Sequence, residues 1–199
     1  MAAAVPLAED EVERAAALIA RAFDEDPLLV HMFPDAGERA RLGPVHLEPV
    51  VRMCALYGSS WRTEDFDAVA AWMPPNAWPP SSERIAACGF AEAGLAVGEA
   101  AFARFHDVYG FVDAFHDRAA PGPHWLLNLV ATEPGRQRRG AASAALAPVL
   151  ERASAGGDPC YLETFAERNL AFYRRHGFEV FVDETHPGTG IRCWGMLRA

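Results

Sequence analysis

One stretch of the chain, residues 128–143, constrains its fold more than any other. It reads NLVATEPGRQRRGAAS, an apolar run that ends at Pro134, a turn with two glycines and three arginines, and an alanine-rich run. This order predicts a strand, a loop and a helix. The first turn of a helix carries free backbone N–H groups and the positive end of the helix dipole. The sequence therefore predicts a phosphate-bearing ligand at this loop.

Short apolar runs bounded by glycine, proline or polar turns predict the strands of a sheet. The expected strands are residues 5–7, 60–63, 68–73, 124–132, 160–164, 178–183 and 191–197. The run at 124–132 is almost continuously apolar, which is typical of a strand buried on both faces. Helical spacing or composition predicts the remaining elements, at residues 9–23, 35–57, 81–119, 140–155 and 164–176. Together they predict a mixed α/β sheet flanked by helices.

Four local signals bear on where these helices begin, bend and end. Asp35 is a suitable N-cap, and Gly43-Pro44 predicts an interruption of the helix that follows, because proline disfavours a helical residue before it. Pro148 should kink the helix at 140–155. Residues 164–167 have the spacing of a capping box, and Gly177 is placed to end that helix in the left-handed conformation.

Residues 81–119 are rich in alanine and phenylalanine. We expect two or three short helices here. Five phenylalanines in this segment need an apolar partner, so it is expected to cover the rest of the molecule and not to be a linker. They are Phe90, Phe102, Phe105, Phe111 and Phe115.

Charge and composition exclude several functions. The formal net charge is -9, which disfavours nucleic acid or an anionic membrane as a partner. All 18 basic residues are arginine, so no lysine can form a Schiff base. The four cysteines lie far apart and predict neither a metal site nor a disulfide framework. No signal peptide or membrane-spanning run is recognisable, and a cytoplasmic protein is expected.

Motifs in the second half point to one family. Residues 137–142 have the form Gln/Arg-x-x-Gly-x-Gly/Ala, and Glu163, Asn169, Tyr173 and Gly177-Phe178 follow in that order. With this pattern the chain resembles the GCN5-related N-acetyltransferase (GNAT) superfamily, whose pyrophosphate loop has that form. The resemblance implies a single GNAT domain over residues 1–199. It also implies a mixed, mostly antiparallel sheet of about six to seven strands, with residues 81–119 as a helical insertion.

The same resemblance implies acetyl-CoA as cofactor. The family's loop holds the CoA diphosphate through backbone amides, which arginine side chains can supplement. A strand before the loop would pair with the pantetheine arm. The residues expected to bind CoA are Leu129, Val130, Ala131, Thr132, Arg136, Gln137, Arg138, Arg139, Gly140, Ala141, Ala142, Ser143, Asn169 and Tyr173.

Residues 125–198 resemble more closely the puromycin N-acetyltransferase-like enzymes of that superfamily. Shared features are the Pro-x-x-Gln-x-x-Gly loop that starts at Pro134, the unusual mid-helix Pro148, and the terminal Cys193-Trp194-x-Met196 region. Ala142 replaces the last glycine of the loop motif. The resemblance fades before residue 125, in the half from which the superfamily builds its acceptor pocket.

Two residues are expected to carry the catalysis. The resemblance implies that Tyr173 protonates the departing CoA thiolate, for which a positioned phenol is suited. Glu163, at the end of a strand, is expected to take the proton of the attacking ammonium, although a structural hydrogen-bonding role is equally compatible with the sequence. His46, His106 and His124 are weaker candidates for the base.

The function predicted from the sequence is acetyl transfer from acetyl-CoA to a small-molecule primary amine, by direct attack in a ternary complex. The acidic residues 24–26 could attract a cationic amine or could simply be a solvated helix end. A monomer or homodimer is expected. Two alternatives remain open, a protein or peptide N-acetyltransferase and a non-catalytic acyl-CoA-binding regulatory module. An apolar setting makes Cys160 a packing thiol and not an acyl carrier.

Overall fold

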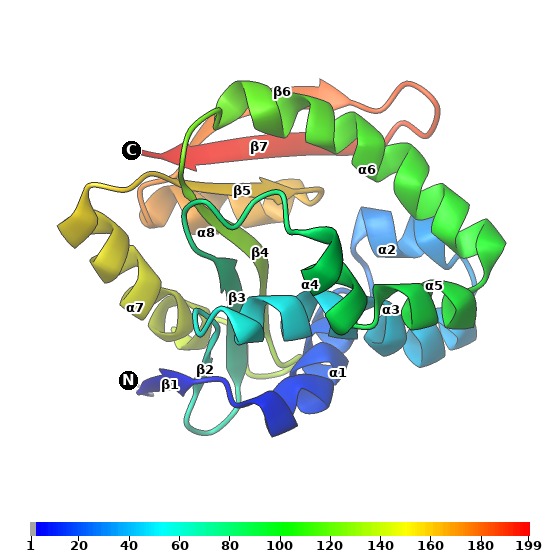
Figure 1. Ribbon diagram of the computed structural model, residues 1–199, viewed down its shortest axis with the longest axis horizontal. Coiled ribbons are helices and arrows are strands. Elements are labelled where there is room, and N and C mark those ends of the chain that lie inside the picture. The colour runs from blue at the N-terminus through cyan, green and yellow to red at the C-terminus, as the bar shows by residue number, and fades with distance from the viewer. Residues whose placement is uncertain (1–2) are drawn as a thin grey trace.

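A computed structural model describes residues 3–199 as a seven-stranded sheet between two layers of helices (Figure 1). The strand order is β1-β2-β3-β4-β5-β7-β6. Only the β4–β5 pair is parallel, and the other neighbours are antiparallel. The strands are β1 (Ala4–Pro6), β2 (Trp61–Thr63), β3 (Ala68–Met73), β4 (Trp125–Thr132), β5 (Cys160–Thr164), β6 (Glu179–Thr185) and β7 (Arg192–Arg198). The predicted mixed, mostly antiparallel sheet is confirmed.

The helices divide between the two faces of this sheet. They are η1 (Glu9–Glu11), α1 (Val12–Ala22), α2 (Pro27–Met32), α3 (Ala36–Leu56), α4 (Ser82–Ala87), α5 (Phe90–Val97), α6 (Glu99–Ala119), α7 (Ala141–Gly156), η2 (Glu167–Asn169) and α8 (Leu170–Arg175). Apolar side chains of α1, α3 and α6 share one core with one face of the sheet, and those of α7 and α8 share another core with the opposite face. No helix in residues 3–199 is long and apolar enough to cross a membrane.

β4 and β5 separate part-way along their length. Their pairing runs from Trp125 opposite Cys160 to Leu127 opposite Leu162 and then stops. In the same place β4 bulges against β3, because Ala71 pairs with Leu129 while the next residue of β3 pairs with Leu127. A bulge adds one residue and reverses which side chains face which side. Accordingly Leu126 faces the α1 side before the bulge, and Leu129 and Ala131 face it afterwards.

Two predictions about the helices are wrong. α3 is continuous through Gly43-Pro44 and contains Pro49 as well. Leu47, Val51 and Cys54 are buried against α1 and the sheet, and this packing stabilises α3 as one helix. Tertiary packing therefore outweighs the local cost of proline. The predicted N-cap Asp35 is confirmed, because its carboxylate accepts the Glu38 N–H at 2.8 Å.

The capping box at residues 164–167 does not form. Thr164 is the last residue of β5, and Ala166 is the N-cap of a short 3-10 turn that precedes α8. The Thr164 hydroxyl accepts instead from the Asn169 side chain, at 3.2 Å. Gly177 has φ +84°, so the predicted left-handed end of the following helix is confirmed.

The segment 81–119 forms three helices, within the predicted two or three, but the last of them is long and not short. α4 and α5 are short, whereas α6 spans 21 residues and crosses over β7 and β6 in Figure 1. Phe115 is buried in the core that α1 and α3 share with the sheet, and Phe111 packs against it. The segment thus covers one face of the sheet, and α6 brings polar residues over the point where β4 and β5 separate.

Candidate active site

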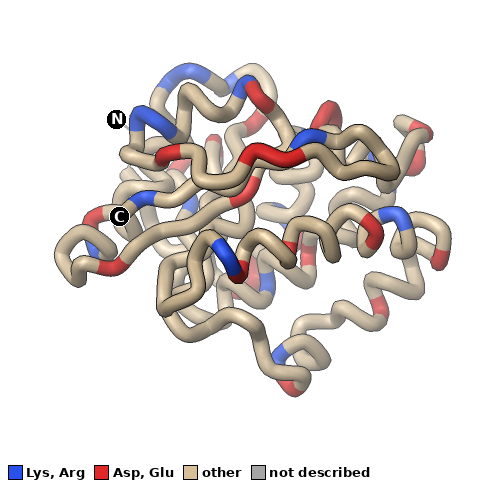
Figure 2. The backbone as a smooth tube through the Cα atoms, turned by 90° about the horizontal axis from the view of Figure 1, so that it is seen from above, with Lys and Arg blue, Asp and Glu red and all other residues tan. Residues whose placement is uncertain are grey.

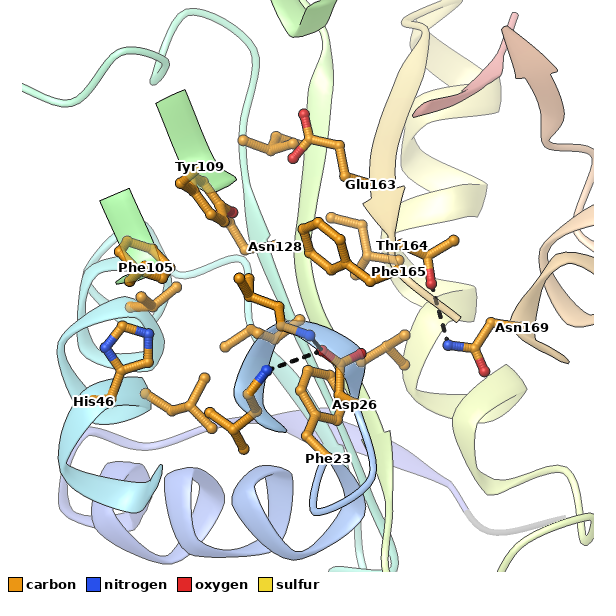
Figure 3. A pocket seen from close by; sticks show the side chains of 18 of the residues that line it. Phe23, Asp26, His46, Phe105, Tyr109, Asn128, Glu163, Thr164, Phe165 and Asn169 are labelled. Carbon is orange, nitrogen blue, oxygen red and sulfur yellow. Dashed lines mark hydrogen bonds between the residues drawn. The ribbon is translucent and has the colours of Figure 1, made fainter. Parts of the chain in front are cut away.

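A cavity of about 110 Å³ lies where β4 and β5 separate (Figure 3). Its floor is the backbone and side chains of residues 126–130 of β4 and residues 163–165 at the end of β5. α3 and the helical cover α6 form one wall, and the turn between α1 and α2 forms another. The splayed strands and the bulge therefore create the cavity, because they remove the hydrogen-bonded neighbour that would fill it.

Glu163 is the first β5 residue beyond the paired segment, and its side chain enters the cavity. The side chain is only 10% exposed, and its Oε1 atom has no hydrogen-bond partner among residues 3–199. Burial raises the pKa of the Glu163 carboxyl to about 8, and the negative charge of Asp113 contributes to the rise. A carboxyl group with this pKa can accept a proton near neutral pH and release it again.

Tyr173 and Asn169 approach the cavity from the other side of β5. Tyr173 is buried on α8, and burial raises the pKa of its phenol, with a smaller contribution from the charge of Asp26. It is therefore held in the protonated form that a general acid needs. Asn169 is the last residue of the 3-10 turn before α8 and also lines the cavity. The structure thus brings both residues to the cavity together with Glu163.

Of the residues in the described range 3–199, three with carboxyl groups line the cavity and no arginine does. Besides Glu163 they are Asp26 and Asp113. Asp26 caps α2 by accepting the Leu28 N–H at 3.0 Å, and burial raises the pKa of its carboxyl to about 6. Asp113 is an exposed residue of α6. In Figure 3 Asp26 lies well away from Glu163, so acidic groups are spread along the cavity.

The remaining acidic residues of the 24–26 cluster have other partners. Asp24 pairs with Arg39 at 3.0 Å, and Glu25 lies 3.8 Å from Arg168. Of the three, only Asp26 lines the cavity. Asp24 and Glu25 thus lie at a helix end with arginine partners, whereas Asp26 is a buried carboxyl group of the cavity, and attraction of a cationic amine stays a prediction.

The predicted CoA-binding residues form a path from the cavity to the start of α7. Leu129 and Val130 line the cavity, and Ala131 and Thr132 continue β4 outward. Beyond Leu127 the backbone of β4 pairs with β3 alone, so its other edge has no strand partner within residues 3–199. A pantetheine arm, which carries two amides, fits such an edge because it can supply the missing hydrogen bonds.

The predicted diphosphate loop is exposed and sharply turned. Gly135, Arg138 and Gly140 all have positive φ, and Gly140 is the N-cap of the 16-residue helix α7. Gln137, Arg138 and Arg139 are exposed, and neither of these two arginines forms an ion pair with any residue in the range 3–199, whereas Arg136 lies 3.7 Å from Asp67. Ala141, Ala142 and Ser143 begin the helix, and the Ser143 hydroxyl lies 3.0 Å from His176.

Several cavity residues carry no signal in the sequence. Tyr109, Asp113 and His116 come from one helix whose composition predicts only a cover. They are four and three positions apart along the sequence, and this spacing places them on one face of a helix. That spacing is the only signal that could have grouped them. His46, a weaker base candidate, lines the cavity, and burial lowers the pKa of its imidazole to about 4.

The other base candidates lie outside the cavity. His106 packs against Phe102 and Phe105, and His124 hydrogen-bonds to His116. Cys160 is buried, and burial raises the pKa of its thiol, which fits the predicted packing role. Residues 3–199 contain no disulfide and no group of three metal-ligating side chains.

The family model described as the acetyltransferase (GNAT) family matches residues 55–178 of this chain. That match covers more than half of the 199 residues, from the end of α3 to the glycine-phenylalanine pair after α8. The chain therefore belongs to the GNAT family and is an acyltransferase. Enzymes of this family generally use acetyl-CoA as co-substrate.

Solved structures with the same fold extend over nearly the whole chain. One from Corynebacterium glutamicum, described as histone acetyltransferase HPA2 and related acetyltransferase, has 21% identity and a TM-score of 0.62, with 100% of this chain and 96% of that chain covered. The polyamine N-acetyltransferase of Drosophila melanogaster has 13% identity and a TM-score of 0.65, with 99% of each chain covered. Arylalkylamine N-acetyltransferase 2 of Aedes aegypti has 12% identity and a TM-score of 0.65, with 98% and 97% covered. At these identities the likeness shows the fold.

Proposed function

We propose that this enzyme transfers the acetyl group of acetyl-CoA to a primary amine of a small molecule, by direct attack in a ternary complex. The observation that carries the proposal is the set of carboxyl groups in the cavity. Asp26, Asp113 and Glu163 line it together with aromatic side chains, and among residues 3–199 no arginine does. At neutral pH Glu163, with a pKa of about 8, is mostly uncharged, so the attraction for a cationic amine comes mainly from Asp26, with a pKa of about 6, and from Asp113.

The donor side of the site has the chemistry that acetyl-CoA needs. The unpaired edge of β4 at residues 129–132 would bind the pantetheine arm, and Asn169 would hydrogen-bond to it. The loop at 136–143 would bind the diphosphate, because the first N–H groups of α7 and the free arginines Arg138 and Arg139 are exposed there. This arrangement leads the acetyl end of the donor toward Glu163 and Tyr173.

In the proposed reaction the amine nitrogen attacks the thioester carbonyl and the carbon–sulfur bond breaks. The incoming ammonium must first lose a proton, and Glu163 accepts it. The departing thiolate receives a proton from Tyr173. Between ammonium and amide the nitrogen loses two protons, of which one restores the thiol and the other leaves to solvent. Negative charge develops on the carbonyl oxygen and is stabilised by N–H donors. We propose that the backbone of the bulge around Asn128 would supply such a donor.

The alternative acceptor is a protein or peptide. One of the structures with this fold is described as a histone acetyltransferase and related acetyltransferase. The helical cover of this chain favours a small acceptor, because Phe105 and Tyr109 of α6 close over the cavity that an extended peptide would have to enter. We also infer that residues 1–199 form one catalytic domain, since the cavity draws on elements from α1 to α8.

An acceptor panel tests this proposal. The purified protein is incubated with acetyl-CoA and with polyamines, agmatine, arylalkylamines, puromycin or amino-terminal peptides, and release of the free CoA thiol is followed. We expect turnover with at least one small primary amine and none with its N-acetylated form. Turnover with puromycin would support the closer resemblance to puromycin N-acetyltransferase-like enzymes. Turnover with peptides alone would overturn the choice of a small acceptor.

A further inference from the structure

Two histidines, of which His116 lines the cavity and His124 does not, connect the cavity to a surface loop. His116 lies on α6 and lines the cavity, and its Nδ1 atom is 3.5 Å from Glu163 Oε1. Its Nε2 atom lies 3.0 Å from Nε2 of His124, which directly precedes β4 and does not line the cavity. His124 Nδ1 in turn lies 2.7 Å from the carbonyl oxygen of Gly122. Both imidazoles are buried, and Gly122 is exposed.

The hydrogen bonds fix the tautomers of both rings. The Gly122 carbonyl can only accept, so His124 Nδ1 carries a hydrogen and its Nε2, in the neutral ring, does not. His124 Nε2 must therefore accept from His116 Nε2–H. The neutral His116 ring then has a bare Nδ1, and this lone pair faces Glu163 Oε1. A proton belongs between these two atoms, since a carboxylate and a bare nitrogen would repel each other.

The surroundings hold His116 in place and tolerate a transient positive charge. Its ring stacks between Trp78, with centroids 5.1 Å apart, and Tyr161, with centroids 4.5 Å apart. Aromatic faces stabilise a cation that lies over them. Burial lowers the pKa of His116 to about 4, so the charge is not permanent. The ionisable groups around the relay are Tyr109, Asp113 and Asp117 from α6, Tyr161 and Glu163 from β5, and His124 before β4.

We propose that His116 and His124 form a proton relay that carries the proton accepted by Glu163 out of the cavity to the surface loop at residues 120–124. This inference rests on the proposed function, in which each turnover releases one proton to solvent. The bound acetyl donor and amine would fill the cavity, so the open side through which water could discharge Glu163 is closed during reaction. The proposed relay would take the proton by a different route, through His124 to the loop that follows α6.

Each transfer in the relay breaks one bond to hydrogen and forms another. The Glu163 O–H bond breaks as His116 Nδ1–H forms, and His116 Nε2–H breaks as His124 Nε2–H forms. His124 then releases its Nδ1 proton to a water that replaces the Gly122 carbonyl. Glu163 is left as a carboxylate, with the hydrogen of His116 now on Nδ1 and that of His124 on Nε2. The starting tautomers return after the products leave: His124 Nδ1 takes a proton from water, His124 Nε2–H passes its proton back to His116 Nε2, and His116 Nδ1–H gives its proton to water that has entered the open cavity. The 3.5 Å contact between Glu163 and His116 is long, but catalytic hydrogen bonds often shorten only when substrates bind.

The kinetic test uses His116→Gln and His124→Gln, which keep a hydrogen-bonding side chain but cannot relay a proton. We expect kcat to fall roughly 10- to 100-fold, with KM for acetyl-CoA unchanged. The rate of the variants should rise with the concentration of a small buffer such as imidazole, whereas that of the wild type should not. His106→Gln, on the same helix but outside the cavity, is the matched control and should retain full activity. Wild-type kcat in His124→Gln would overturn the relay and leave the proposed function standing.

A second test does not depend on activity. Nuclear magnetic resonance of protein with ¹⁵N-labelled histidine reports the tautomer of each ring, and His116 can be assigned by its proximity to the Trp78 and Tyr161 rings. We expect His116 to carry its hydrogen on Nε2 and His124 on Nδ1 at neutral pH. Glu163→Gln should keep this pattern, because the glutamine amide can donate to His116 Nδ1. The opposite tautomer in either ring would overturn the relay, even if the variants failed to fold.

Discussion

At the scale of single residues, the surroundings of Glu163 decide what its carboxyl group can do. A glutamate in water is ionised at neutral pH and is too weak a base to take a proton from an ammonium group. Glu163 is buried next to the splayed end of β5, and burial raises the pKa of its carboxyl to about 8. The same side chain on the exposed end of a strand would be a structural or solvated group, which is why the sequence alone left both roles open.

This pKa predicts the pH profile of the enzyme. The base must be a carboxylate, so kcat/KM should rise with pH by about tenfold per unit below pH 8 and bend near pH 8. Glu163→Gln should lower kcat/KM at least about 100-fold and remove the bend near pH 8. The only slope left should be the one caused by loss of a proton from the ammonium form of the unbound substrate. Steady-state rates with one amine, measured from pH 6 to pH 10, give the pH profiles of the wild type and of Glu163→Gln. A bend that persists in the glutamine variant would assign the base to another group.

Tyr173 is expected to act on the departing sulfur and not on binding. Tyr173→Phe removes only the hydroxyl, so packing on α8 and affinity for CoA should persist, while kcat should fall roughly 100-fold. Titration calorimetry with CoA measures the affinity, and the rate of thiol release measures kcat. Tyr109→Phe is the matched comparison, because Tyr109 lines the same cavity on α6. A larger loss of kcat in Tyr109→Phe than in Tyr173→Phe would assign the general acid to Tyr109 on α6.

At the scale of elements, the phosphate loop depends on a backbone conformation that only glycine adopts cheaply. Gly140 has φ +85°, and a Cβ atom added there would meet nothing within 4 Å. Gly140→Ala is therefore expected to act through strain alone and to lower the free energy of unfolding by about 1–2 kcal/mol. Affinity for CoA should fall several-fold, because relief of the strain turns the first N–H groups of α7 away from the diphosphate.

A matched control for this variant is Gly110→Ala on the exposed face of α6. Gly110 also has open space around a Cβ atom but has no positive φ. Alanine here should raise the free energy of unfolding by about 0.5–1 kcal/mol and leave CoA affinity unchanged. Denaturant unfolding and calorimetry measure the two quantities. Equal affinity of both variants for CoA would show that the loop at residues 136–143 does not hold the diphosphate.

The sequence predicted elements better than it predicted their partners. β3 and β5 begin and end where the apolar runs at 68–73 and 160–164 do, because both strands are buried and their pattern is unbroken. Pro44 misled the prediction for α3, since packing against α1 outweighs a local signal. The link between Glu163, His116 and His124 could not be predicted, because three separate elements bring these residues together and none carries a motif for it.

At the scale of the whole molecule, the two halves of the chain contribute different parts of the site. β4, β5, α7 and α8, all from the second half, carry the residues assigned to the donor. α1, α2, α3 and α6 close the cavity and carry Asp26, Asp113 and His116. Acidic and basic residues are scattered over the backbone in Figure 2, with blue segments among the red ones. Acceptor specificity is therefore expected to follow changes in residues 23–46 and 105–116.

Acetyl-CoA alone should stabilise the protein, because in the proposed binding mode it would contact β4, the loop and α8, which come together in the native state only. A ligand at 100 times its dissociation constant adds about 2.7 kcal/mol to the free energy of unfolding. In a chain of this length that corresponds to a rise in Tm of roughly 5–10 °C. S-Acetylpantetheine, which has no diphosphate, should give a smaller rise at equal concentration. Differential scanning fluorimetry with both compounds distinguishes the contribution of the β4 edge to binding from that of the loop. Equal shifts in Tm would mean that the loop at 136–143 contributes nothing to binding. No shift with acetyl-CoA would contradict the proposed donor site.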